Sequence, residues 1–217
     1  MRKIYSISFF VFLFLSTQLY ARGGFFGEFS LGIDGKIKGE TATLNDVADN
    51  SLVISDRTNA AGFKFQAGYK HEWLEKISAI GMVGYQSRNS KKATNLTIKT
   101  EIFDLSFAAQ YSPTEHIFIR AGTNFPAVGK LIKENDNQSQ EDITGGEFST
   151  TGKFGVDVIA GYSFMKDLFL NFGFTITRFS ASKKFSGYYH PTAGTSYTIK
   201  YGNVRIYQYV VGLKYIF

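Results

Sequence analysis

Most of this chain alternates between apolar and polar residues at every second position, from Phe25 to Phe217. Successive side chains of a β-strand point to opposite faces, so this period predicts strands with one apolar face. The alternation falls into eight runs, at residues 25–37, 61–70, 77–86, 103–111, 117–125, 154–164, 168–177 and 207–217. Each run is about the 9–11 residues that a tilted strand needs to cross a bilayer. In this pattern Ile37 is expected on the apolar face, and Phe118 lies out of phase.

The connections between these runs alternate in length. Short turns are expected around residues 72–76, 112–116 and 165–167, and longer polar loops near 39–59, 87–96, 126–152 and 180–203. All three prolines, Pro113, Pro126 and Pro191, are expected in turns or loops, because a strand ladder needs every backbone N–H. Short turns at one end and long loops at the other are typical of outer-membrane barrels, whose chain ends lie on the short-turn, periplasmic side.

Alternation alone also fits a soluble, lipocalin-like barrel with its apolar face inward. Glycines gather on the polar face, where small residues suit the narrow interior of an eight-stranded barrel. They are Gly62, Gly68, Gly84, Gly122, Gly155, Gly161, Gly173 and Gly212. Tyrosines on the apolar face, and Trp73 in the first turn, suit the bilayer interface. The sequence therefore predicts an all-β fold, an eight-stranded antiparallel up-and-down transmembrane barrel.

Residues 1–21 have the pattern of a secretory signal peptide. Arg2 and Lys3 precede an apolar stretch, and Ala21 offers a small residue for cleavage, although Leu19 stands where alanine is usual. Cleavage would leave a single barrel domain over residues 22–217. It would also remove Arg2 and Lys3 and so lower the formal net charge from +6 to +4. A chain that is only mildly basic gives no support for nucleic-acid binding. The absence of cysteine excludes a disulfide scaffold.

The last strand, YQYVVGLKYIF, resembles the sequence that the outer-membrane barrel assembly machinery reads. Its alternate residues are Tyr209, Val211, Leu213, Tyr215 and Phe217. With the signal peptide and eight runs, the chain resembles the small outer-membrane barrels: the OmpA-like transmembrane domain, OmpX and the opacity-type surface antigens. The resemblance implies a bacterial outer-membrane location and contact with the assembly machinery during insertion.

The polar face also carries charges of both signs, expected in the barrel interior. They are Glu28, Asp34, Lys36, Lys64, Lys70, Asp104, Arg120, Asp157 and Lys214. Buried charges are costly unless they pair, so this set predicts a salt-bridge network that fills the lumen. Lys214 is expected to reach Glu28, because barrel closure makes the first and last strands neighbours. A narrow ion path is the alternative.

The loops are the remaining place for function. The last loop mixes lysines with aromatic residues that suit a host surface, a carbohydrate or lipopolysaccharide phosphates. These candidates are Lys183, Lys184, Phe185, Tyr188, Tyr189 and Tyr197. The three histidines are too scattered for one metal site, so neither metal nor cofactor is expected. His190 has serines in its loop, but no strand shows the histidine and serine spacing of an outer-membrane lipase.

These observations predict a non-enzymatic, monomeric barrel in contact with outer-membrane lipids and lipopolysaccharide. Its expected role is structural support of the membrane, surface interaction through the loops, or both. A small pore is the alternative, and a lipid-modifying enzyme is the third option.

Overall fold

The computed structural model describes residues 23–39, 42–48, 57–91, 96–135, 146–186 and 196–217. The expected signal peptide lies outside these ranges. Within them, no helix is long and apolar enough to cross a membrane.

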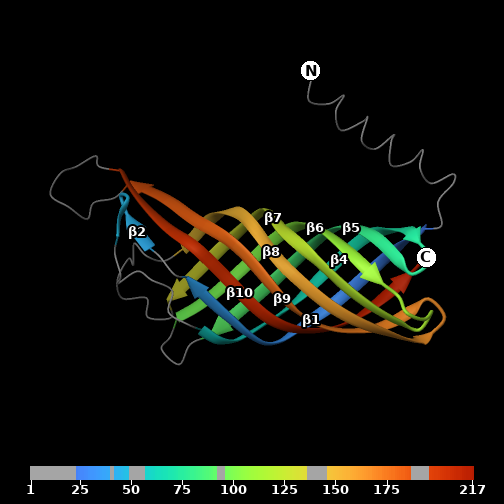
Figure 1. Cartoon of the computed structure of the whole chain (residues 1–217). Helices are drawn as coiled ribbons and strands as arrows, with labels where there is room; N and C mark the ends of the chain where they lie inside the picture. The colour runs from blue at the N-terminus through green and yellow to red at the C-terminus, as the bar shows by residue number, and fades with distance from the viewer. Residues whose placement is uncertain (1–22, 40–41, 49–56, 92–95, 136–145, 187–195) are drawn as a thin grey trace, which may run out of the picture.

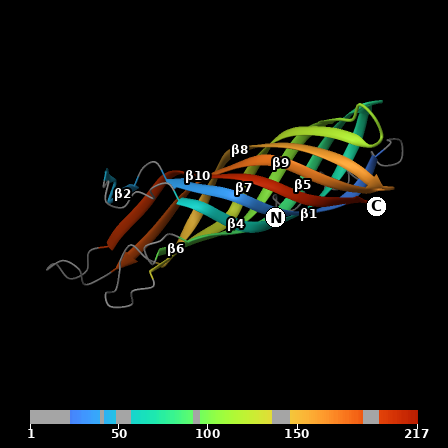
Figure 2. The ribbon, with the colours of Figure 1, turned by 90° about the horizontal axis from the view of Figure 1, so that it is seen from below.

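Eight long antiparallel strands form a closed ring (Figures 1 and 2). They are β1 (Gly23–Gly39), β4 (Arg57–Leu74), β5 (Ile77–Lys91), β6 (Leu96–Tyr111), β7 (Ile117–Asn135), β8 (Gly146–Met165), β9 (Leu168–Ser186) and β10 (Ser196–Ile216). Each strand pairs with its neighbour in sequence, and β1 pairs with β10 to close the ring. The predicted fold class is confirmed.

Three short turns join strands at one end of the barrel, which we call the turn end, and the C-terminus lies there as well (Figure 1). They fall between β4 and β5, β6 and β7, and β8 and β9, as predicted. The last turn contains Asp167 at a φ of 63°, a left-handed conformation that aspartate tolerates better than most residues. At the opposite loop end, the short strands β2 (Ala42–Leu44) and β3 (Val47–Ala48) form a hairpin, and β2 pairs with β10.

The turn-end half of the barrel has apolar side chains outside. Large hydrophobic residues there are exposed on every strand of the ring. They include Phe25, Leu31, Ile33, Phe65, Val83, Phe103, Leu105, Phe107, Ile117, Ile119, Val156, Val158, Tyr162, Phe172, Tyr209, Leu213 and Tyr215. A continuous apolar belt of this kind around a closed ring is what a bilayer requires, because the ring leaves no backbone edge in lipid.

The strands are longer than predicted, at 15 to 21 residues. The extra length lies at the loop end, where parts of the expected loops are strand. Pro126, expected in a loop, lies inside β7 at a shift in its register with β6. A proline is tolerated there because a bulge already interrupts the ladder.

The loop-end half reverses the pattern, with apolar side chains inside and polar ones outside. We call its buried apolar cluster the loop-end core. Its members are Ile37, Ala42, Ala60, Ile98, Ile102, Leu131, Phe148, Phe179, Ala181, Ile199, Tyr201, Val204 and Ile206. Lys99, Ser149 and Lys200 are among the residues on the outer side. This half is therefore built like a soluble barrel, which is the correct arrangement for strands that continue beyond the lipid into water.

Bulges produce part of this reversal. In β1 the pairing shifts between Ile33 and Lys36, where Asp34 adopts a φ of 48°. The extra residue exchanges the two faces, so Ile37 is fully buried inside the barrel and the prediction that it faces outward is wrong. A second shift, between Tyr201 and Val204 in β10, has the same effect on that strand.

Candidate functional site

The interior of the turn-end half holds buried ion pairs. Arg120 on β7 donates to both oxygens of Glu28 on β1, at 2.8 and 3.1 Å, and both side chains are 2% exposed. Lys64 on β4 lies 2.9 Å from Asp104 on β6. In both pairs the two strands are not neighbours in the ring. Their side chains meet across the lumen because an eight-stranded barrel is narrow.

Amide and hydroxyl groups extend these pairs into a network. Asn124 donates to Asp157 at 2.8 Å, and Gln86 donates to Asp104 at 3.4 Å and to Thr177 at 3.3 Å. Partners of this kind make buried charge more tolerable, because fixed hydrogen bonds replace part of the lost contacts with water.

Lys214 forms a separate layer nearer the turn end. It is opposite Glu28 in the pairing of β10 with β1, as closure requires. Its ammonium group donates to Gln110 at 3.2 Å and lies over the rings of Phe26 and Phe118, at 4.3 and 4.8 Å from their centres. The out-of-phase Phe118 is therefore an interior residue that contacts this cation.

Three of the predicted interior charges do not belong to the buried network. Asp34 is exposed and Lys36 is half-buried on the outer side, because the β1 bulge exchanges the faces before both residues can enter the lumen. Placing them in the lumen was wrong. Lys70 points inward, but it lies at the open turn end, where it pairs with Glu72 at 3.1 Å.

The sequence analysis also missed Arg88, which is 1% exposed inside the barrel. Its position continues the polar phase of Gln86 by two residues, so a longer run for β5 would have found it. Among the described residues, the buried charged side chains are three carboxylates and four cations. The interior of the described barrel therefore carries one more cation than anion.

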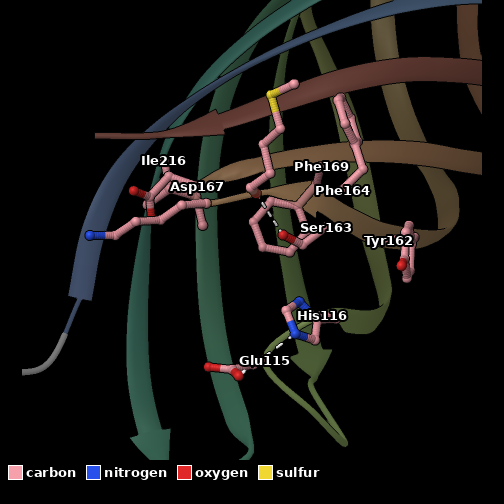
Figure 3. Close-up of a pocket in the computed structure, with 10 residues that line it drawn as sticks. Glu115, His116, Tyr162, Ser163, Phe164, Asp167, Phe169 and Ile216 are labelled. Carbon is pink, nitrogen blue, oxygen red and sulfur yellow. Dashed lines mark hydrogen bonds and ion pairs between the residues drawn. The ribbon is translucent and has the colours of Figure 1, made fainter.

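A pocket of about 550 Å³ opens at the turn end (Figure 3). It brings His116, Glu115 and Ser163 together, which the sequence analysis did not foresee. The imidazole lies 3.7 Å from the carboxylate of Glu115. The hydroxyl of Ser163 donates to the backbone carbonyl of Met165 at 2.7 Å, so that bond, and not one to a histidine, holds its proton. Within the described ranges, no three potential ligand side chains cluster as a metal site would require.

The loop candidates are only partly described. Lys183 on β9 lies 5.7 Å from the centre of the Phe148 ring, and Lys184 is exposed. Phe185 and Tyr197 are opposite one another in the pairing of β9 with β10. Tyr188, Tyr189 and His190 lie outside the described residues.

Tyr209, Leu213, Tyr215 and Phe217 of the last strand are exposed on the outer face of the barrel, and their role in assembly stays a prediction. Tyr215 and Phe217 pack edge to face, with ring centres 5.1 Å apart. The backbone N–H of Phe217 donates to the carbonyl of Phe25 at 2.9 Å, so the final residue takes part in closing the ring.

No protein-family model matches the sequence, and a comparison with curated protein sequences finds no match. Solved structures do match. Neisserial surface protein A (NspA) has a TM-score of 0.53 at 14% identity, covering 90% of this chain and 99% of that chain. Ail, the attachment invasion locus protein of Yersinia pestis, has a TM-score of 0.50 at 11% identity, covering 91% and 99%. The outer membrane protease OmpT from Escherichia coli has a TM-score of 0.44 at 14% identity, covering 89% and 97%.

The likenesses to NspA and Ail extend over nearly the whole of those chains and concern the fold. They agree with the closed ring of eight strands and with the apolar belt around its turn-end half. This chain has the fold of the small eight-stranded outer-membrane β-barrels.

Proposed function

We propose that this protein is a closed, non-enzymatic barrel that supports the outer membrane and presents a rigid platform at the cell surface. The observation that carries the proposal is the filled interior. Above the ion pairs, the loop-end core places large side chains such as Phe148, Phe179 and Tyr201 inside the ring, each fully buried. Large apolar side chains buried at this level leave little room for water, and hydrated ions cannot cross such a layer without a large loss of hydration free energy.

The surface role is supported by the length of the strands. β9 and β10 continue well beyond the apolar belt, to Ser186 and from Ser196. The last loop between them contains the aromatic pair Tyr188 and Tyr189. The paired strands on either side of this segment form a stiff support, and preorganised supports lower the entropy cost of binding a partner.

Conductance in planar bilayers tests the closed lumen. The purified barrel is expected to give no stable conductance steps. A variant with Phe148, Phe179 and Tyr201 replaced by glycine, which removes the largest rings of the loop-end core, is the matched positive control. Large, stable steps from the wild-type protein would contradict the closed lumen and favour the alternative of a small pore.

Whole-cell binding tests the surface role. Cells that display the wild-type barrel are expected to bind host cells or immobilised glycans more than cells that display the Y188A/Y189A variant. Equal binding by both, at equal surface amounts, would leave membrane support as the role of the barrel.

The non-enzymatic assignment has its own test. Replacement of His190, or of His116 together with Ser163, is expected to leave the lipopolysaccharide profile of the cells unchanged. A changed profile in either variant, with the barrel still folded, would favour a lipid-modifying enzyme.

A further inference from the structure

The pocket of about 550 Å³ at the turn end is lined from both faces of the barrel wall, and we call it the rim pocket (Figure 3). Tyr162 and Phe164, at the end of β8, line it from the outer face, where both side chains are exposed. Ser163, between them, is buried on the inner face. Phe169 also lines the pocket, and its ring packs against the interior ring of Phe118 with centres 5.5 Å apart. The rim pocket therefore joins a lipid-facing surface to the mouth of the barrel.

The rim pocket lies where the apolar belt meets charged residues. Ile117 on β7 is opposite Tyr162 on β8, and both side chains are exposed on the outer face. The charges begin just beyond this pair, because His116 immediately precedes Ile117 and Lys166 follows the end of β8. A tyrosine at the edge of an apolar belt, next to charged residues, is typical of the boundary between hydrocarbon and lipid headgroups.

Two turns supply charges of both signs to the pocket. The turn between β6 and β7 provides Glu115 and His116, whose carboxylate and imidazole groups are 3.7 Å apart. The turn between β8 and β9 provides Lys166 and Asp167. Glu115 and Asp167 approach the pocket from different sides (Figure 3). A ligand that spans the pocket would meet an acid from one turn and a base from the other, which suits a headgroup that carries both charges.

Backbone hydrogen bonds tie both turns to neighbouring strands. The N–H of Ser163 donates to the carbonyl of His116 at 2.7 Å, and the N–H of Ile216 donates to the carbonyl of Asp167 at 2.9 Å. The charged groups therefore extend from a backbone that is already fixed. A site built in advance loses less conformational entropy when its ligand binds.

We propose that the rim pocket binds phosphatidylethanolamine. Lys166 contacts the phosphate, Glu115 accepts hydrogen bonds from the ammonium group, and the acyl chains lie along the outer-face residues of the pocket. Charge-assisted hydrogen bonds of this kind are roughly twice as strong as neutral ones. The trimethylammonium group of phosphatidylcholine has no N–H to donate, and phosphatidylglycerol has no cation. The proposal requires the barrel to span a membrane, but it depends neither on the closed lumen nor on the surface role of the loops.

Solution NMR of the folded full-length barrel in maltoside micelles tests the proposal. Short-chain phosphatidylethanolamine, phosphatidylcholine and phosphatidylglycerol are added separately, and the backbone amide signals of His116, Ser163 and Asp167 report binding. Phosphatidylethanolamine is expected to give saturable shifts at these residues and their neighbours, and to bind at least about threefold more tightly than either other lipid, as one charge contact at an exposed site allows. Phosphoethanolamine, which lacks the acyl chains, is expected to bind more weakly than the lipid.

Two substitutions separate the contacts of the headgroup. E115Q is expected to lower the affinity for phosphatidylethanolamine at least about threefold and to leave the other two affinities unchanged, because only this lipid has an ammonium N–H. K166Q is expected to weaken the binding of all three lipids, because each contains a phosphate. The matched control is E75Q, which removes an acid from the turn between β4 and β5, outside the rim pocket, and is expected to bind as the wild type does.

The proposal is overturned if phosphatidylcholine or phosphatidylglycerol binds the wild type as tightly as phosphatidylethanolamine, or if phosphoethanolamine binds as tightly as the lipid. Equal losses in E115Q and E75Q, or unchanged binding by K166Q, would also overturn it. Shifts spread evenly around the apolar belt would do the same, because they would mean unspecific coverage of the barrel by lipid. Should a variant fail to fold, the four ligands on wild-type protein still decide the question.

Discussion

The ion pair between Arg120 and Glu28 offers the sharpest test of a filled interior. Substitution of Arg120 by Met keeps much of the side-chain volume and removes the charge. Glu28 then loses two hydrogen bonds, of 2.8 and 3.1 Å, in a site where its side chain is 2% exposed. The carboxylate remains in the barrel with Ser30 at 3.5 Å, and with Lys214 opposite it on β10.

Removal of one partner of a buried ion pair typically costs about 3–5 kcal/mol, because the other charge is left without compensation. The nearby cation Lys214 offsets part of this loss in R120M, so we expect the lower end of that range. E28Q leaves Arg120 and Lys214 together without their carboxylate, so we expect the upper end. The double variant E28Q/R120M is expected to cost less than the sum of the two by about 2 kcal/mol, the coupling of the pair.

The free energy of unfolding can be measured by urea titration of the barrel folded in lipid vesicles. Trp73, the single tryptophan, lies exposed near the turn end and reports the transition by its fluorescence. Heat-modifiable gel mobility gives a second readout of the folded fraction. The matched control is K99M, which breaks the outward pair of Lys99 and Glu134, and such exposed pairs contribute about 0–1 kcal/mol.

A loss of less than about 1 kcal/mol in R120M, no larger than in K99M, would refute this reasoning. It would mean that water reaches Glu28 and replaces the guanidinium group. The lumen would then be hydrated at this level, and a pore would become the better interpretation of the polar layer.

Four further substitutions have definite expectations. G152A would bring a Cβ into a clash with the backbone oxygen of Pro126, so it should lower the free energy of unfolding by about 1–3 kcal/mol. G81A, where no atom lies within 4 Å of a new Cβ, should stay within about 0.5 kcal/mol in the same urea titration. F148A should cost about 3–5 kcal/mol through the cavity it leaves in the loop-end core, and a cost near zero would mean that the core is loosely packed. F217A keeps the backbone hydrogen bond that closes the barrel and removes only the aromatic side chain. We expect a reduced yield of heat-modifiable barrel in cells, which would assign a role in assembly to this side chain. An unchanged yield would contradict that role.

The turn-end half of the barrel was predictable because its pattern is local. Residues at alternate positions share a face in any strand, so the outward belt and the turns could be located without knowledge of pairing. The inward position of Glu28, Asp104 and Arg120 followed from the same phase. Arg88 was missed only because the run on β5 was ended two residues too early.

The loop-end half was not predictable in this way. A membrane barrel and a soluble barrel have opposite faces inside, and this chain changes from one to the other along most of its strands. β5 is an exception, because Arg88 and Ser90 are buried at its loop end. On β1 the change depends on the bulge at Asp34, which needs the pairing of β1 with both neighbours to be visible. Without it, Ile37 was assigned outward, and Asp34 and Lys36 inward.

The sequence by itself determined that this protein is an eight-stranded barrel with an apolar belt, because periodicity and turn spacing are properties of neighbouring residues. Only the tertiary structure decided which side chains meet. Arg120 and Glu28 are 92 residues apart in the chain and form an ion pair because the ring is narrow.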